Sequence, residues 1–269
     1  RRSGGGRSVN VRAHHVAHYA WLRLVRSHYL KALLAASFFV AVAAFGGSGG
    51  SDSVMARMTA LEVAIKASRW FVWLAAIWIG LSCITDEINA QTARTLFTKP
   101  VRRVEVVLGL MGGGALYLTL VTAVNTLLIF VIAVGRDIPV SLGSFALLQV
   151  SMLIPVFAVL ALTMVLSLVF SKPIAGFLMI FLAQENVWDV LATTLNASQR
   201  PDWFKVPGVF LLKLCYLISP TYHRFIQEYQ EFIQLEFPWG EFVFHTAAIG
   251  FYVGAAALLA TFILRRKDV

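Results

Sequence analysis

Long apolar runs divide this chain, and most are close to the roughly 20 residues that an α-helix needs to cross the hydrocarbon core of a bilayer. We expect spans at about 29–45, 67–85, 106–134, 144–170, 174–194 and 242–264. The chain is 58% hydrophobic and 14% charged, with a mean hydropathy of +0.74, values that exclude an ordinary soluble domain. The sequence therefore predicts an all-α integral membrane protein with six transmembrane helices.

The basic residues indicate how these spans are oriented. Most of the Lys and Arg residues fall in alternate connecting segments and at the two ends of the chain. Loops on the cytoplasmic side carry an excess of Lys and Arg, so we expect both termini in the cytoplasm and the protein in a membrane such as the bacterial inner membrane. This arrangement accounts for the net charge of +9 without a nucleic-acid partner.

The N-terminal region precedes the first span. Residues 1–10 are expected to be disordered, and Val11 to Ser27 forms a basic amphipathic helix typical of the headgroup region. Its apolar stripe comprises Ala13, Ala17, Ala20, Trp21 and Leu24. His14 and His18 have the i, i+4 spacing of a metal site, but no carboxylate or cysteine is nearby, so interfacial packing is the preferred interpretation.

Two further segments, one rich in glycine and one flanked by prolines, have predicted structural roles. Gly112, Gly113 and Gly114, near the start of the third span, allow a neighbouring helix to approach closely. Val206 to Ser219 is apolar but too short to span and has prolines at or beside its ends, which favours a re-entrant or interfacial helix before the last span.

The segment from Asp86 to Leu110 separates the second and third spans and is basic. As a helix, its first half has a polar face, while apolar side chains fall on the opposite side. The polar face comprises Glu87, Gln91, Arg94 and Thr98. Pro100 ends this helix. We expect residues 86–99 to form a short helix on the membrane surface with its polar side turned to a soluble partner.

The spacing of particular residues in this segment resembles the loop after the second span in ABC transporter permeases of the type-2 exporter class. The matching positions are Glu87, Thr92, Leu96, Pro100, Arg103 and Gly109. Gln91 and Leu110 depart from that pattern, where the family commonly has Gly and Lys. The resemblance implies that this loop is a coupling helix that seats in a separate ATPase subunit. The implied coupling residues are Glu87, Gln91, Thr92, Arg94, Leu96, Pro100 and Arg103.

The same resemblance implies a pair of permease chains, identical or homologous, working with two ATPase subunits that bind ATP and Mg²⁺. The chain itself has no phosphate-binding loop and no pattern of catalytic residues, so we expect neither enzymatic activity nor a cofactor of its own. The alternatives are a scaffold subunit of a membrane complex that transports nothing and an ion-coupled transporter. The latter class usually shows internal repeats or several buried charges.

The fifth predicted span becomes polar at Gln184, Glu185 and Asn186. Glu185 lies 11 residues after Ile174, about 17 Å into the span at the rise of an α-helix. A carboxylate facing lipid at that depth is unfavourable, so these residues are candidates for the translocation path or the seam between two permeases. The alternative is that the span breaks near Ala183 and that Glu185 already lies in an outer vestibule.

Overall fold

The structure is a computed structural model that describes residues 6–47, 54–84, 102–138, 140–182, 187–197, 206–213 and 239–266. The regular structure within these ranges is helical, which agrees with the predicted all-α class. The helices are α1 (Gly6–Arg26), α2 (His28–Gly47), α3 (Val54–Cys83), α6 (Arg103–Gly135), α7 (Leu142–Val169), α8 (Lys172–Leu182), α9 (Val187–Ala197) and α12 (Trp239–Arg266). A further helical stretch covers 206–213.

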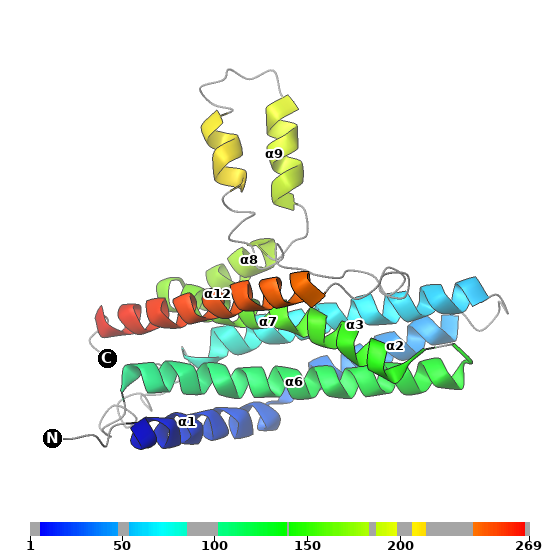
Figure 1. The fold of residues 1–269 in the computed structure, drawn as a ribbon, viewed down its shortest axis with the longest axis horizontal. Coiled ribbons are helices and arrows are strands. Elements are labelled where there is room, and N and C mark those ends of the chain that lie inside the picture. The colour runs from blue at the N-terminus through cyan, green and yellow to red at the C-terminus, as the bar shows by residue number, and fades with distance from the viewer. Residues whose placement is uncertain are drawn as a thin grey trace.

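The long helices form one elongated bundle (Figure 1). We call one end of it the near end, where α1 and α6 begin and α3 and α12 finish, and the other the far end, where α2 and α6 finish and α3 and α7 begin. The helix α6 contacts α1, α2, α3, α7 and α12, while α7 also contacts α3, α8 and α12. The two helices α6 and α7 therefore form the centre of the bundle.

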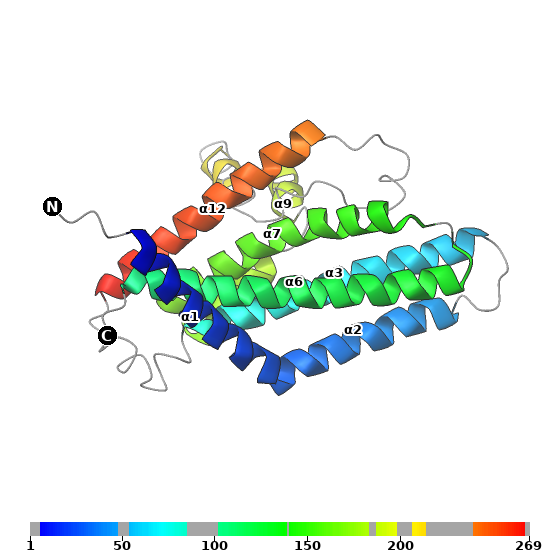
Figure 2. The same cartoon turned by 60° about the horizontal axis from the view of Figure 1, so that its bottom comes forward.

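Four helices are long and apolar enough to cross a membrane: Met55–Cys83 in α3, and α6, α7 and α12. They cover four of the predicted spans. The pair α1 and α2 passes the same test only when it is taken together, and it is bent by 59°. Figure 2 shows this bend, with α1 crossing α6 towards the near end and α2 continuing towards the far end. The described residues thus hold four candidate spans, or five with the bent pair, and six are not confirmed.

Two predicted boundaries differ from the observed helices. The span predicted at about 67–85 starts much earlier, because residues 54–66 continue it as one helix in the 30-residue α3. Its charged residues interrupt the apolar run but not the helix, because Glu and Lys are themselves good helix formers. At the start of the chain, α1 begins at Gly6, so the last part of the segment predicted to be disordered is helical.

The fifth predicted span is not seen as one helix. The 11-residue α8 ends at Leu182, α9 starts at Val187, and residues 183–186 lie outside the described part of the chain. Figure 1 shows α9 and the stretch 206–213 side by side, standing away from the bundle. An added Cβ at Gly208 would lie 2.6 Å from Leu195 Cδ2, so the two helices pack closely there. The re-entrant segment predicted at Val206–Ser219 is not confirmed.

Gly113, in the first half of α6, lies in close contact with α1. A Cβ at Gly113 would lie 2.6 Å from the Ala17 carbonyl oxygen and 2.7 Å from Ala20 Cβ. The predicted close approach is therefore observed at Gly113, where α1 makes it, while Gly114 faces Ile79 of α3 and Leu160 of α7. Val16, Ala20 and Leu24 of α1 are buried in this contact region, so the apolar side of α1 is used for packing within the protein.

The buried apolar side chains form two clusters. The larger one fills the near end and the middle of the bundle with residues of α1, α3, α6, α7 and α12. The smaller one lies at the far end and contains Leu61, Ile129, Phe145 and Leu148 among its most buried members. The bundle thus has a near core and a far core, and these names are kept below.

Candidate functional site

The predicted coupling segment is flanked by described residues on both sides. Residues 85–101 lie outside the described part of the chain, and they include Glu87, Gln91, Thr92, Arg94, Leu96 and Pro100. The segment leaves the bundle after α3 and rejoins it at Arg102, just before α6. Both flanks lie at the near end, so the segment begins and ends on the same side of the bundle (Figure 1).

Arg103 is the one predicted coupling residue that the structure describes. Its Nη1 donates a hydrogen bond to the carbonyl oxygen of Leu264 in the last turn of α12. The last carbonyls of a helix have no partner within the helix, and a cation placed there also interacts favourably with the helix dipole. Arg103 therefore joins the beginning of α6 to the end of α12.

Glu105 closes the first turn of α6. Its Oε2 accepts a hydrogen bond of 3.1 Å from the backbone N–H of Arg102, and the residue is only 3% exposed. The N-terminus of a helix carries a partial positive charge, so a carboxylate in this turn is stabilising. Glu105 fixes the direction in which the chain enters α6 from the predicted coupling segment.

Positive charge is concentrated at this same end. The Arg102 side chain is exposed beside the start of α6, and Arg265 and Arg266 are exposed in the last turn of α12. The Arg266 guanidinium stands 4.5 Å from the centre of the Phe262 ring, a cation–π distance. The near end therefore offers exposed cations around the two helix ends that Arg103 connects.

The predicted path residues Gln184, Glu185 and Asn186 also lie outside the described residues. They fall between α8 and α9, whose directions differ in both views (Figures 1 and 2). Their assignment to a translocation path or to a seam between chains is a prediction from the sequence.

A layer of buried polar side chains was not predicted from the sequence. It comprises Ser37, Ser68, Thr122, Asn125, Gln149 and Ser151, all at most 7% exposed, on α2, α3, α6 and α7. We call these six residues the polar layer. Most of them are outnumbered by apolar neighbours within their own helix, so a mean hydropathy hides them. The signal available in the sequence was the rarity of Asn and Gln inside apolar helices.

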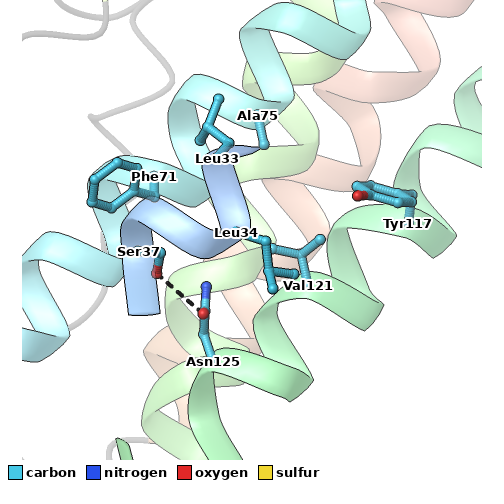
Figure 3. A pocket seen from close by; sticks show the side chains of 8 residues that line it. All are labelled: Leu33, Leu34, Ser37, Phe71, Ala75, Tyr117, Val121 and Asn125. Atoms are coloured by element: carbon cyan, nitrogen blue, oxygen red, sulfur yellow. Dashed lines mark hydrogen bonds between the residues drawn. The ribbon is translucent and has the colours of Figure 1, made fainter. Parts of the chain in front are cut away.

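Within the polar layer, Ser37 Oγ donates a 3.1 Å hydrogen bond to Asn125 Oδ1 (Figure 3). Three other polar atoms in it, Thr122 Oγ1, Asn125 Nδ2 and Gln149 Nε2, have no hydrogen-bond partner among the described residues. One small cavity adjoins Ser37 and Asn125, and a second adjoins Thr122 and Gln149; each has a volume of about 10 Å³. The walls of both cavities are almost entirely apolar, and the unpaired atoms are buried beside them.

The histidines on α1 form no metal site with other ligands in the described ranges, where no group of three His, Cys, Asp or Glu residues is close enough to hold an ion. His14 and His15 are both exposed, with their ring centres 6.2 Å apart. Both histidines therefore lie on the polar side of α1, away from the side that packs on α6.

A comparison with known proteins bears on the arrangement as a whole. A search of curated proteins gives no match to this chain. The family model described as ABC-2 family transporter protein matches residues 22–264, from the second half of α1 to the last turn of α12. The match includes the apolar helices, the predicted coupling segment and both of its flanks. This chain is an integral membrane protein that belongs to the ABC-2 transporter family.

Proposed function

We propose that this protein is the transmembrane subunit of an ATP-driven exporter, and that residues 86–99 couple it to an ATPase on a separate chain. Two permease chains, identical or homologous, would form the translocation path together with two ATPase subunits that bind ATP and Mg²⁺. In this proposal the near end faces the cytoplasm, with both termini on that side.

The observation that carries the proposal is the family match, taken together with the organisation of the near end. The flanks of the segment lie there, and so do Arg102, Arg265 and Arg266. An excess of exposed cations is typical of the cytoplasmic side of a membrane protein, where ATP is present. The segment is therefore expected on the side from which an ATPase approaches.

The contacts of the near end suggest how a push on this segment would reach the spans. Glu105 fixes the first turn of α6 to the incoming chain, and Arg103 ties that turn to α12. A displacement of the segment would thus move the near ends of α6 and α12 together. For ATP to shift the permease between two states, the ATPase must contact the segment differently in each state.

The proposal is tested by reversing charge on the polar face with the double variant E87K/R94E. The full chain is purified from its native membranes, and the retained partner subunits and their ATP hydrolysis are measured. We expect the ATPase to be lost, or its hydrolysis to become independent of the permease, because the polar face would meet its partner with opposite charges.

A matched control reverses two exposed charges away from the near end, R136E and E241R together. This control should keep its ATPase partner. If E87K/R94E retains a normally coupled ATPase, the assigned coupling segment is wrong. If the native complex contains other membrane subunits and no ATPase, the chain is a scaffold subunit instead.

A further inference from the structure

The exposed side of α2 combines one cation with an apolar strip. Four exposed residues follow one another at i, i+4, i+8 and i+11 and therefore share one side of the helix: Lys31, Ala35, Phe39 and Val42. We call these four residues the α2 strip. The buried Ser37 and Ala41 lie on the opposite side, where Ser37 bonds to Asn125 of α6 and Ala41 joins the far core. The strip is thus turned away from the helices that pack on α2.

A second exposed cation lies just across the bend between α1 and α2. Arg26 is the last residue of α1 and is exposed. Ser27 alone separates the two helices, which meet at an angle of 59° (Figure 2). Lys31 follows Arg26 by five residues, so the two cations flank the bend. The α2 strip therefore has positive charge at its α1 end and apolar side chains along the rest of its length.

This part of the chain carries a strong excess of positive charge. Residues 1–51 contain seven Lys and Arg residues and no Asp or Glu. The helix α1 packs mainly on α6, whose one acidic residue in the described range is Glu105; that carboxylate is buried and accepts from the N–H of Arg102. Lys31 also lies near the start of α2, the positive end of the helix dipole. An anion is the partner whose charge complements the bend.

The bend lies at the level where the headgroups of a bilayer are expected. Leu33, just after Lys31, lines the same cavity as Tyr117 of α6. From Tyr117, α6 continues for 18 residues to Gly135 at the far end, about 27 Å at the rise of an α-helix. The hydrocarbon core of a bilayer is about 30 Å thick. A bilayer that begins at the far end therefore has its other layer of headgroups close to Lys31.

We propose that the α2 strip and Arg26 bind an anionic phospholipid. Its headgroup phosphate lies at Lys31 and Arg26, and its acyl chains lie along the apolar part of the strip, where Phe39 is 68% exposed. Such a lipid has a negative charge followed by a long apolar tail, in the same order as the cations and apolar side chains of the protein. Because it contacts both sides of the bend, the bound lipid stabilises the angle between α1 and α2.

Photo-crosslinking in nanodiscs of defined composition tests this proposal. A photo-reactive amino acid is placed at Phe39 of the full chain. The nanodiscs contain equal amounts of phosphatidylglycerol, which is anionic, and phosphatidylcholine, which is zwitterionic, with the same acyl chains in both. The lipids attached to the protein after irradiation are identified by mass spectrometry. We expect phosphatidylglycerol to exceed phosphatidylcholine several-fold among the adducts at position 39.

Phe251 on α12 is the matched control position. It is 82% exposed, and α12 has no Lys or Arg before Arg265. A photo-reactive amino acid at this position should attach the two lipids in about equal amounts. The same ratio of lipids at positions 39 and 251 would overturn the proposal. A crosslink from position 39 to a second copy of the chain would also overturn it, because the α2 strip would then be a protein interface.

The double variant R26Q/K31Q removes both charges and keeps side chains that form hydrogen bonds. It should bring the lipid ratio at position 39 to that at position 251; K31Q alone serves if the double variant does not fold. The control R57Q/R136Q removes two positive charges at the far end and should leave the ratio unchanged.

An unchanged preference in R26Q/K31Q, or an equal loss of preference in R57Q/R136Q, would contradict a lipid site at the bend. None of these measurements depends on an ATPase, so their failure is distinguishable from failure of the proposed function.

Discussion

The two ends of the bundle are held together by different contacts. At the near end, α1 packs on Gly113, Glu105 caps α6, and the Arg103 guanidinium ties α6 to the end of α12. At the far end, a small apolar core is accompanied by an exposed hydrogen bond of 3.0 Å, from Arg57 Nη1 to the Arg136 carbonyl oxygen. At the near end, polar side chains thus hold two helix ends, and this is the end at which both flanks of the predicted coupling segment lie.

Under the proposed function, this difference indicates where a push from an ATPase would act on the bundle. A helix end that is fixed by a cap and a guanidinium passes a displacement on to its helix, whereas the far-end turn is held mainly by its own backbone hydrogen bonds and by the exposed contact from Arg57. Breaking the near-end contacts one at a time should thus affect both stability and coupling, while changes at the far end should affect stability slightly and coupling not at all.

The largest effect is expected from G113A. The new Cβ would lie 2.6 Å from the Ala17 carbonyl oxygen, so α1 must move away from α6. Overpacking of this kind destabilises proteins by about 1–3 kcal/mol, and we expect a lowered temperature of thermal unfolding in nanodiscs. The neighbouring G112A is the control, because its nearest contact would be 3.8 Å and alanine is a better helix former. Equal stability of the two variants would show that α1 does not pack on Gly113.

The next effect is expected from R103A, which removes the hydrogen bond to Leu264. A hydrogen bond to a charged group contributes about 1.5–3 kcal/mol, and partial exposure should lower this to about 1 kcal/mol. The last turn of α12 should exchange its amide hydrogens faster. R102A, which changes an exposed neighbouring arginine, should leave that exchange rate unchanged. If R102A has the same effect as R103A, the connection between α6 and α12 does not depend on Arg103.

A similar but smaller effect is expected from E105A, which leaves the N–H of Arg102 without its acceptor. The loss of a helix cap lowers stability by about 0.5 kcal/mol or more, and we expect a value near this lower limit because one backbone N–H is affected. The variant E105Q keeps an acceptor oxygen and should retain most of that stability in the same unfolding assay. A larger loss for E105Q than for E105A would contradict the capping role.

The smallest effect is expected from R57A at the far end, because an exposed hydrogen bond contributes about 0.5–1 kcal/mol. R136A is its control, since the acceptor is the backbone carbonyl and remains in place. Neither variant should change the ATP hydrolysis of a bound ATPase. Loss of coupling in R57A would remove the distinction between the two ends.

The sequence was sufficient to locate the helices α6, α7 and α12, because uninterrupted apolar runs determine their length. It also indicated the close approach at Gly112–Gly114. It did not indicate that α1 makes this approach, because an apolar stripe fits lipid and protein equally well. The continuity of α3 was missed because hydropathy reports how apolar a segment is. Charged residues lower the hydropathy of residues 54–69 without ending the helix.

The polar layer was missed because its members come from four different helices, which are brought together only in the bundle. Ser37 and Asn125 are 88 residues apart and yet share a hydrogen bond. No periodicity within one span indicates such a pair. The predicted coupling and path residues are a different case: apart from Arg103, they lie outside the described residues, and their roles stay predictions.

Site-specific photo-crosslinking tests most directly whether the near end carries an ATPase. A photo-reactive amino acid is placed at Arg94 in the predicted coupling segment or at Arg136 at the far end, and native membranes are irradiated. The account predicts an ATP-binding subunit attached to the chain from position 94 and none from position 136. An ATPase adduct from position 136, or no ATPase adduct from position 94, would contradict it.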